Sequence, residues 1–334
     1  MKYFITGGAG FIGSNFIRYL LDHNHDIKIL NFDKLTYAGN LNNLSDIKKD
    51  PRYTFVKGDI CKRKKIETTF NLFRPDYVIN FAAESHVDKS IIQPDIFINS
   101  NIVGVQNLLQ VSSQDSVRKY LQISTDEVYG SLGKTGMFTE NTPLDPRSPY
   151  SASKASADLL TQSYFHTFNL PVNITRCSNN YGPFQFPEKL IPLTILNCLI
   201  GKKIPVYGDG LNVRDWIHVM DHCSAIDLVL HHGVPGEVYN VGANNEQSNI
   251  GIVKRIIQIL ADLRPDLMVS ENLVSSVEDR KGHDRRYAID PAKISKELNW
   301  KPRIPFEKGL ADTVTWYLDH SDWWKPIISA EEHN

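Results

Sequence analysis

The sequence predicts an α/β protein built on a doubly wound parallel sheet, with a smaller substrate-binding lobe toward its C-terminus. Short runs rich in β-branched and aromatic residues alternate with longer segments of helical period along the first half of the chain. The strand-like runs are apolar along their length, as expected for strands that helices cover on both faces. Alternating strands and helices of this kind predict parallel pairing.

The apolar runs predict strands at 2–6, 28–33, 53–59, 77–82, 119–124 and 172–176. Segments of helical period lie between them, near 12–23, 62–73, 94–114 and 150–168.

The alternation loosens after residue 178, where prolines punctuate shorter elements. We therefore predict a dinucleotide-binding domain over 1–178, to which the chain returns at about 211–243 through a strand at 237–241. The smaller lobe is predicted from 179–210 and 244–334, with helices at 292–298 and 306–320.

A glycine cluster at 7–13, Gly-Gly-Ala-Gly-Phe-Ile-Gly, joins the first strand to the first helix. Glycine lets a tight turn approach a pyrophosphate, and the helix N-terminus offers N–H groups and partial positive charge. Asp33 ends the second strand about 20 residues later, where a carboxylate binds ribose hydroxyls. This pattern is typical of a Rossmann domain. Asp33 favours NAD because it repels the 2′-phosphate of NADP. The positive charge of the neighbouring Lys34 would instead help to accommodate that phosphate.

The predicted cofactor contacts come from the glycine cluster, from strand ends and from the helices that follow them. They are Gly7, Gly10, Phe11, Ile12, Gly13, Asp33, Lys34, Asp59, Ile60, Ala82, Ala83, Ser100, Tyr150, Lys154 and Asn180.

Two pairs of side chains carry the predicted chemistry. Tyr150 and Lys154 are four residues apart and share one helix face, so the ammonium can stabilise a phenolate that acts as a base toward a sugar hydroxyl. Asp126 and Glu127 follow the fifth strand. Eliminating water from a hexose needs a base beside a carbonyl and an acid for the departing hydroxyl, which two carboxyl groups in different protonation states supply.

These motifs resemble the extended short-chain dehydrogenase/reductase superfamily that acts on nucleotide sugars. The run Thr-Asp-Glu-Val-Tyr-Gly at 125–130 resembles the signature of its dTDP-glucose 4,6-dehydratase family. Further matching motifs stand at 82–88, 148–154, 179–183, 214–216 and 282–287. Related epimerases and decarboxylases share the glycines, Tyr150 and Lys154 but lack the adjacent acidic pair.

The resemblance implies an NAD-dependent hydro-lyase with a nucleotide-sugar substrate. Tyr150 takes the 4-hydroxyl proton while C4 is oxidised, Glu127 removes the C5 proton, and Asp126 protonates the leaving C6 hydroxyl before hydride returns to C6. Thr125 binds the sugar near its 4-oxygen, and Lys154 also holds the nicotinamide ribose.

The same resemblance implies a substrate site with Arg214 and Arg280 on the diphosphate. Its residues are Ser85, Thr125, Asn179, Lys189, Leu190, Pro205, Tyr207, Arg214, Asn249, Arg280 and His283. Lys281, where the family has proline, and Met220, where it has a polar residue, depart from the pattern. The segment 130–149 is predicted to be a loop over the site.

Two other functions share part of the motif set. A nucleotide-sugar 4-epimerase or decarboxylase uses the same glycines and Tyr150 but forms no 6-deoxy product. A silent dinucleotide-binding sensor has the same fold, and the presence of Tyr150 and Lys154 disfavours it.

Composition excludes several classes of partner. The 37 Lys and Arg are balanced by 38 Asp and Glu among 334 residues, so nucleic acid is not predicted as a partner. The longest apolar run, 190–200, is shorter than the roughly 20 residues that span a bilayer, and no signal-peptide core is present.

The remaining sequence features concern thiols, metals and assembly. Four cysteines without a C-x-x-C pair predict free thiols in a cytoplasmic protein. His218 and His222 have the spacing of a metal pair but no third ligand, so no metal is predicted. We expect a homodimer through the helices near 94–114 and 150–168, as in the resembling family, with Ala155, Leu159 and Ser163 as outer positions.

Overall fold

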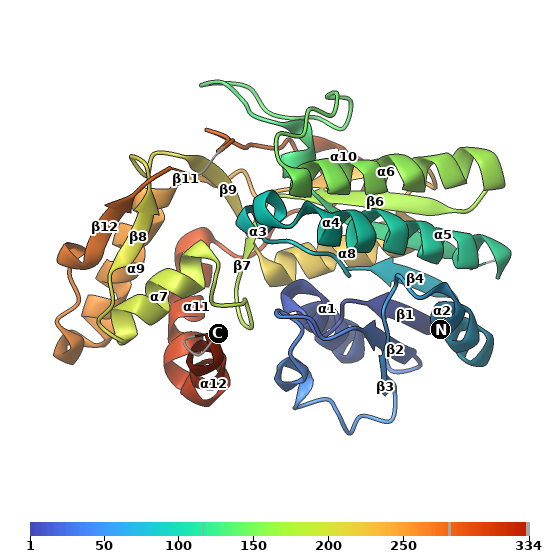
Figure 1. Ribbon diagram of the computed structural model, residues 1–334, viewed down its shortest axis with the longest axis horizontal. Coiled ribbons are helices and arrows are strands. Elements are labelled where there is room, and N and C mark those ends of the chain that lie inside the picture. Colours follow the sequence, from blue (N-terminus) through green and yellow to red (C-terminus); the bar gives the residue numbers. More distant parts are fainter. Residues whose placement is uncertain (116, 280–281, 332–334) are drawn as a thin grey trace.

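A computed structural model describes residues 1–115, 117–279 and 282–331 of the chain. Its larger part is a parallel sheet of seven strands in the order β10-β6-β5-β4-β1-β2-β3 (Figure 1). The strands are β1 (Lys2–Thr6), β2 (Lys28–Asp33), β3 (Tyr53–Lys57), β4 (Tyr77–Asn80), β5 (Lys119–Thr125), β6 (Val172–Cys177) and β10 (Val238–Val241). The predicted doubly wound fold is confirmed.

The strand order reverses between β1 and β4, because β2 and β3 continue to one side and β5 and β6 to the other. Such a switch point opens a crevice at the carboxyl ends of the strands, where doubly wound proteins bind their ligands.

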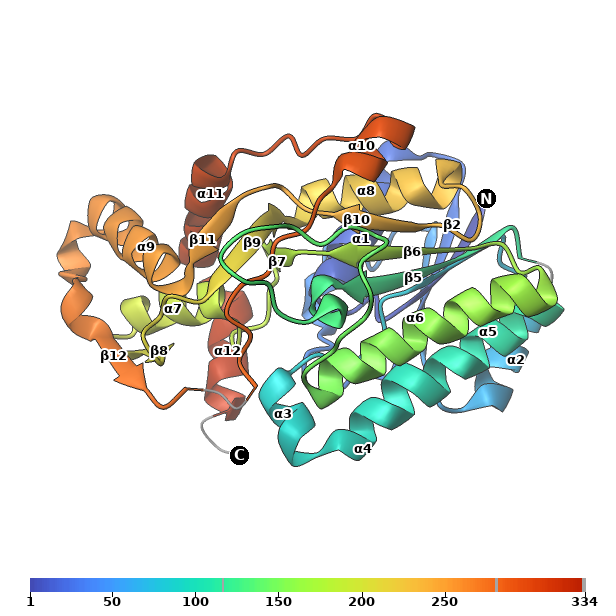
Figure 2. The same ribbon diagram turned by 90° about the horizontal axis from the view of Figure 1, so that it is seen from above.

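Helices cover both faces of the sheet (Figure 2). One face carries α1 (Phe11–His23) and α8 (Val219–His232), and the other carries α2 (Arg63–Phe73), α5 (Gly104–Gln114) and α6 (Pro149–Phe168). Alternate residues of β1 enter the two cores: Tyr3 and Ile5 pack with α1 and α8, and Phe4 packs with α2 and α5. This burial on both faces explains why the strands are continuously apolar.

The helix predicted at 94–114 is interrupted. It consists of α4 (Pro94–Phe97), a π-helical turn η2 (Ile98–Val103) and α5. Asn101 in this turn is buried and bonds both the N–H and the carbonyl of Glu84, as well as the Ser153 hydroxyl. The turn therefore ties the segment after β4 to α6, a long-range contact that helical period alone does not predict.

The smaller part contains two short sheets and a helical layer. The sheets are β11-β9-β7 and β12-β8, formed by β7 (Asn179–Tyr181), β8 (Ile204–Tyr207), β9 (Val213–His218), β11 (Glu246–Ser248) and β12 (Val274–Val277). The helices packed with them are α7 (Leu190–Leu199), α9 (Asn249–Leu263), α11 (Phe306–Asp319) and α12 (Ser321–Glu331). Within the range 211–243, β10 joins the large sheet but β9 does not.

The remaining elements are short or connect the two parts. They are η1 (Leu41–Leu44), α3 (Val87–Ile92), η3 (Asp126–Tyr129), η4 (Pro265–Leu267), η5 (Glu271–Leu273) and α10 (Ala292–Leu298). Among the described residues, no helix is long and apolar enough to cross a membrane.

Candidate active site

A cavity opens at the carboxyl ends of the central strands and gathers every residue predicted to contact the cofactor. It is also lined by the five residues predicted to be catalytic, Thr125, Asp126, Glu127, Tyr150 and Lys154. Segments from β1, β2, β4, β5 and β6 meet here because parallel strands present their carboxyl ends at one edge.

The glycine cluster forms the floor of this cavity. Gly7 has a φ of 68°, and a Cβ there would lie 2.5 Å from the backbone nitrogen of Ala82. A Cβ on Gly13 would lie 2.5 Å from the Gly7 carbonyl oxygen. Gly10 is the N-cap of α1, where no side chain caps the helix. The close backbone approach and the uncapped helix N-terminus fit a pyrophosphate.

Asp33 is fixed at the end of β2 by backbone donors. Its Oδ2 accepts from the Ala9 N–H at 2.9 Å and its Oδ1 from the Leu35 N–H at 2.8 Å. Lys34 forms an ion pair with Asp59 at 3.0 Å. Because Asp59 already neutralises the charge of Lys34, less of that charge is available to a 2′-phosphate.

Tyr150 and Lys154 lie in the first turns of α6, which begins with a capping box between Ser148 and Ser151. The Lys154 Nζ donates to the Ile123 carbonyl at 2.6 Å. Burial raises the pKa of Tyr150 well above its usual value, and the charge of Glu127 raises it further. Burial of Lys154 likewise lowers the pKa of its ammonium group. That Lys154 stabilises the Tyr150 phenolate stays a prediction.

Asp126 and Glu127 occupy the first turn of η3, directly after β5. The Thr125 hydroxyl accepts from the Glu127 N–H at 3.3 Å and donates to Asp126 Oδ1 at 3.2 Å. Asp126 is 2% exposed, whereas Glu127 is half-buried. Burial raises the pKa of Asp126 well above its usual range, with Glu127 and Asp215 adding to the effect. Burial thus favours the protonated form of Asp126.

A buried polar network behind η3 was missed from the sequence. The Arg176 Nε donates to Asp158 at 2.8 Å, and its Nη1 donates to the Tyr129 hydroxyl at 2.9 Å. Tyr129 in turn donates to Asn240 Oδ1 at 2.8 Å. The network connects η3, α6, β6 and β10. The charged residue Arg176 inside the otherwise uncharged strand 172–177 was the feature of the sequence that could have indicated this network.

The predicted substrate residues divide into two groups. Ser85, Thr125, Asn179 and Lys189 line the cavity, and Lys189 donates to the Ser85 carbonyl at 3.1 Å. Those that do not line it are Leu190, Pro205, Tyr207, Arg214, Asn249 and His283. Arg280 and Lys281 lie outside the described residues.

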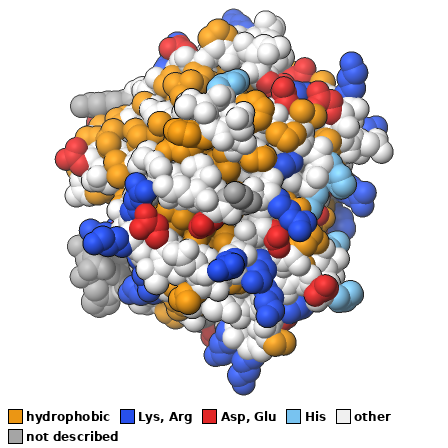
Figure 3. Space-filling view, turned by 90° about the vertical axis from the view of Figure 1, so that its right-hand side faces the viewer, with side chains coloured by type: hydrophobic (Ala, Val, Ile, Leu, Met, Phe, Trp, Pro, Cys, Tyr) orange, Lys and Arg blue, Asp and Glu red, His pale blue; other side chains and the backbone are white. Residues whose placement is uncertain are grey.

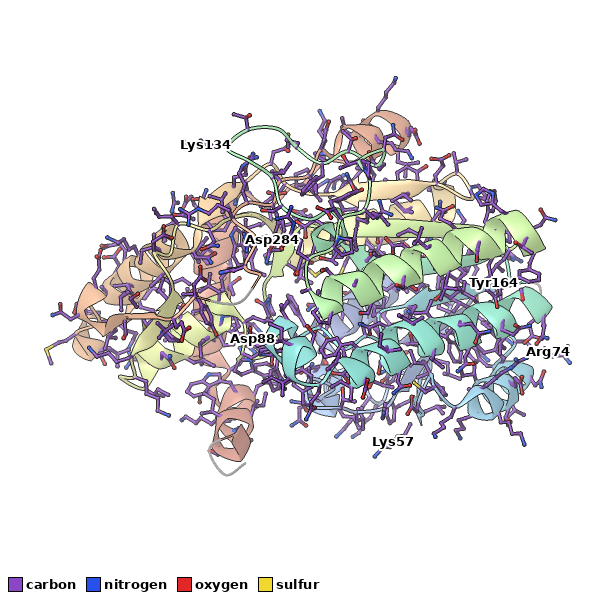
Figure 4. All side chains as sticks on the ribbon, turned by 45° about the horizontal axis from the view of Figure 1, so that its top comes forward. Lys57, Arg74, Asp88, Lys134, Tyr164 and Asp284 are labelled. Atoms are coloured by element: carbon purple, nitrogen blue, oxygen red, sulfur yellow. The ribbon has the colours of Figure 1, made fainter. Side chains whose placement is uncertain are left out.

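Two of the predicted substrate residues beyond the cavity, Arg214 and Tyr207, lie where the two parts of the molecule meet. Arg214 donates to the Asp284 carbonyl at 3.0 Å, and its guanidinium lies 4.2 Å from the centre of the Tyr287 ring. The Tyr207 hydroxyl is 3.5 Å from Asp88 on α3. Figure 4 labels Asp88 and Asp284 at this junction.

Several cavity residues were not predicted. They are Thr36, Ala38, Gly39, Glu84, Gln185, Phe186 and Glu188, together with neighbours of predicted residues such as Phe32 and Cys177. Glu188 accepts from the Tyr37 hydroxyl at 3.0 Å and lies 3.4 Å from His86 Nε2. In the sequence, only its position next to the predicted substrate residue Lys189 indicated that Glu188 lines the cavity.

Two further predictions concern the segment 130–149 and Met220. The segment 130–149 does not line the cavity. It packs on residues 285–290, where Phe138 pairs with Ile289, and its place over the bound substrate stays a prediction. Met220 packs against the large apolar core, which accounts for an apolar residue at that position.

The two histidines with metal-pair spacing have separate partners. His218 accepts from the Met220 N–H at the start of α8, and His222 Nδ1 lies 2.8 Å from Asn180 Oδ1. Burial lowers the pKa of His222 to about 3. Among the residues that the structure describes, no group of three or more His, Cys, Asp or Glu is placed to hold a metal.

Comparison with known proteins identifies relatives along the whole chain. The family model described as GDP-mannose 4,6 dehydratase matches residues 4–313. The dTDP-glucose 4,6-dehydratase of Neisseria meningitidis serogroup B is 49% identical over 98% of this chain and 96% of its own. The crystal structure of dTDP-glucose 4,6-dehydratase from Bacillus anthracis in complex with NAD has 52% identity and a TM-score of 0.90, covering 98% of this chain and 99% of its own. The Streptomyces venezuelae dTDP-glucose 4,6-dehydratase with NAD bound has 45% identity and a TM-score of 0.93, covering 98% and 100%.

Proposed function

The chain belongs to the dTDP-glucose 4,6-dehydratase family, and from that premise we propose that it converts dTDP-glucose to dTDP-4-keto-6-deoxy-glucose as an NAD-dependent hydro-lyase. One observation carries the proposal: Asp126, whose burial raises its pKa, stands beside Glu127 in the cavity that also contains Tyr150 and the glycine cluster. Elimination needs such an acid next to a base, whereas epimerisation at C4 does not.

The residues around the glycine cluster fit NAD. The backbone cradle at Gly7 and Gly13, the uncapped start of α1 and the two oxygens of Asp33 correspond to pyrophosphate and ribose contacts. When bound, NAD supplies a hydride acceptor at C4 that returns the hydride at C6, and its oxidised ring adds a positive charge beside Tyr150.

We assign the oxidation step to α6. Tyr150 accepts the proton of the 4-hydroxyl as C4 becomes a ketone, and Lys154 one turn later supplies a positive charge on the same helix face. Because burial raises the pKa of Tyr150, its phenolate depends on nearby positive charge. Thr125 holds the sugar near the 4-oxygen.

We assign the elimination step to η3. The ketone at C4 acidifies the C5–H, Glu127 takes that proton, and the protonated Asp126 gives its own to the departing C6 hydroxyl, which leaves as water. Hydride then reaches C6, and Glu127 returns its proton to C5. After one turnover Tyr150 has gained the 4-hydroxyl proton and Asp126 has lost one. Loss of a proton from Tyr150 to solvent and uptake of one by Asp126 restore both groups, and the 4-ketone remains in the product.

We further propose that the two parts of the chain divide the ligands. The ranges 1–178 and 211–243 hold NAD, and the ranges 179–210 and 244–334 hold the nucleotide and its diphosphate. The position of Arg214 at the junction, with its guanidinium 4.2 Å from the centre of the Tyr287 ring, supports a diphosphate that crosses from one part to the other.

Proton NMR of a reaction mixture tests the activity. Incubation with dTDP-glucose should yield a new C6 methyl signal, and Glu127→Gln should not. Parallel incubations with other nucleoside-diphosphate glucoses measure the preference for thymidine. Conversion to a 4-epimer without a methyl signal would instead show that the protein is a nucleotide-sugar 4-epimerase.

We also propose a homodimer formed through α4, α5 and α6, which lie along one side of the molecule (Figure 2). Large apolar side chains are exposed on this side and on the neighbouring α3, with Leu159 at 63% and Ile92 at 78%. Ala155 was expected on this outer face but is buried against η3, so the face is formed by Leu159 and Ser163 instead.

Light scattering of two leucine variants tests the dimer. Leu159→Glu should convert a dimeric mass to a monomeric one at micromolar concentration. Leu72→Glu is the matched control, because Leu72 is 83% exposed on α2, outside the helices of the proposed interface. Figure 3 shows one end of the molecule, with hydrophobic side chains mostly in the upper half of the view and several Lys and Arg side chains in the lower half. A monomeric wild-type protein would rule out the proposal.

We place the enzyme in the cytoplasm on the state of its thiols. Cys61, Cys177, Cys198 and Cys223 are all free, as is usual in a reducing compartment.

A further inference from the structure

Trp323 on the C-terminal helix α12 contacts the dinucleotide-binding part through one buried hydrogen bond. Its indole N–H donates to Oδ1 of Asn43 on η1 at 2.8 Å. Asn43 is 1% exposed and Trp323 9%. Because the two residues stand 280 positions apart, only the folded chain brings them together.

Asn43 connects this contact to the glycine cluster. Its Nδ2 donates to the Ala9 carbonyl at 2.9 Å, and the Asn40 N–H donates to the same oxygen at 3.0 Å. On the other side of the residue, the Ala9 N–H donates to Asp33 at 2.9 Å. Ala9 is fully buried between Gly8 and Gly10, so these bonds fix the loop that faces the pyrophosphate.

The ring of Trp323 packs on two aromatic rings of the smaller part, one of which contacts the larger part. It packs at ring-centre distances of 5.1 Å on Trp316 and 5.8 Å on Phe184. The guanidinium of Arg18, on α1, lies 4.2 Å from the centre of the Phe184 ring, and Arg18 also donates to the Asn43 carbonyl. The indole therefore presents its N–H to Asn43 in one orientation.

We propose that Trp323 and Asn43 are positioning residues for the cofactor, which hold the Ala9 backbone and thereby the glycine cluster in the conformation that binds NAD. The proposal rests on NAD binding in the cavity and not on the identity of the sugar nucleotide. A loop that is already fixed loses less conformational freedom when its ligand binds, and it must break these bonds to open. NAD should therefore leave slowly while the contact between Trp323 and Asn43 is intact.

The release rate of NAD from the loaded enzyme tests this proposal directly. NAD-loaded protein is mixed with an excess of alcohol dehydrogenase and ethanol, which reduce NAD only after it is released, and NADH fluorescence is followed. Trp323→Phe keeps an aromatic ring and removes the N–H donor. It should release NAD about three- to tenfold faster, the effect of one lost hydrogen bond. Asn43→Ala, which loses both contacts, should release NAD faster still.

Trp324→Phe is the matched control. The Trp324 indole donates to the Tyr317 carbonyl at 2.8 Å, within the smaller part of the molecule, so its loss removes an equivalent bond that does not reach Asn43. Its NAD release rate should remain within twofold of wild type. The double variant Trp323→Phe/Asn43→Ala should release NAD no faster than Asn43→Ala alone, because Trp323 acts through Asn43.

Three results would overturn the proposal: a wild-type release rate in Trp323→Phe, equal acceleration in Trp324→Phe, or fully additive effects in the double variant. None of these depends on turnover of dTDP-glucose. A wild-type protein that retains NAD but forms no C6 methyl product would refute the proposed activity and leave this test valid.

Discussion

The cavity and the smaller part of the molecule hold their charges in different ways. Several charged groups of the cavity are buried and bond to the backbone, as Asp33 does with Ala9 and Lys154 with Ile123. In the smaller part several pair at the surface, as in Asp209–Arg285, which are 53% and 54% exposed. Buried polar groups have few alternative partners, whereas exposed ion pairs exchange with water and contribute little. The first region is therefore sensitive to single substitutions and the second is tolerant of them.

The largest effect is expected at Tyr150. Tyr150→Phe removes the acceptor of the 4-hydroxyl proton, so the reaction should stop before oxidation and dehydration should fall by roughly 10²–10⁴-fold or more. Single-turnover absorbance should detect no enzyme-bound NADH, and mass spectrometry in deuterated water should detect no exchange at C5. NADH formation at the wild-type rate would remove Tyr150 from the oxidation step.

The same assay should distinguish the roles of the two carboxyl groups of η3, Asp126 and Glu127. Glu127→Gln should still form NADH and a 4-keto hexose but leave C5 unexchanged, because the base is gone. Asp126→Asn keeps the base and should exchange C5–H while dehydration slows by roughly 10²–10⁴-fold. Exchange that persists only in Glu127→Gln would show that the two roles are reversed.

Cofactor choice should respond to Asp33 alone. The wild-type enzyme should bind NAD more tightly than NADP, and Asp33→Asn, which keeps an oxygen for the Ala9 N–H, should reduce that preference by about tenfold, or about 1.4 kcal/mol. Calorimetry with both cofactors measures the ratio. Equal binding of NAD and NADP by the wild-type enzyme would contradict the prediction.

The buried acid should reduce stability as the pH rises. Above the ordinary pKa of an aspartate the unfolded chain loses a proton from Asp126, while the folded chain keeps it because burial raises that pKa. Unfolding is thus favoured increasingly between the unfolded and the folded pKa. Asp126→Asn removes this dependence, so its urea midpoint relative to wild type should rise from pH 5 to pH 8. A constant difference would mean that Asp126 is ionised in the folded protein.

The smallest effect is expected at the exposed pair. Arg285→Met should leave the urea midpoint unchanged because water replaces its contact with Asp209. Arg176→Met is the comparison, since it leaves Asp158 charged and buried without a partner and should lower the midpoint clearly. Similar urea midpoints for the two variants would contradict the expected difference in sensitivity to substitution between the two regions.

Local patterns in the sequence were sufficient to predict much of this protein. The apolar runs, the glycine cluster after β1 and the spacing of Tyr150 and Lys154 each depend on neighbours within a few residues, and the strands and α6 appear where these patterns predict them. The residues predicted to contact the cofactor line one cavity for a similar reason, because most of them lie at or just after the carboxyl ends of parallel strands.

Tertiary structure alone decided the features that depend on distant contacts and on the removal of water. The π-helical turn at 98–103 accompanies the bonds of Asn101 to Glu84 and Ser153, and the segment 130–149 packs on 285–290. The raised pKa of Asp126 results from its burial near two other carboxyl groups, and Trp323 meets Asn43 only across the whole chain. Periodicity and motif spacing report what a residue's neighbours favour, but desolvation and long-range hydrogen bonds exist only after the chain has folded.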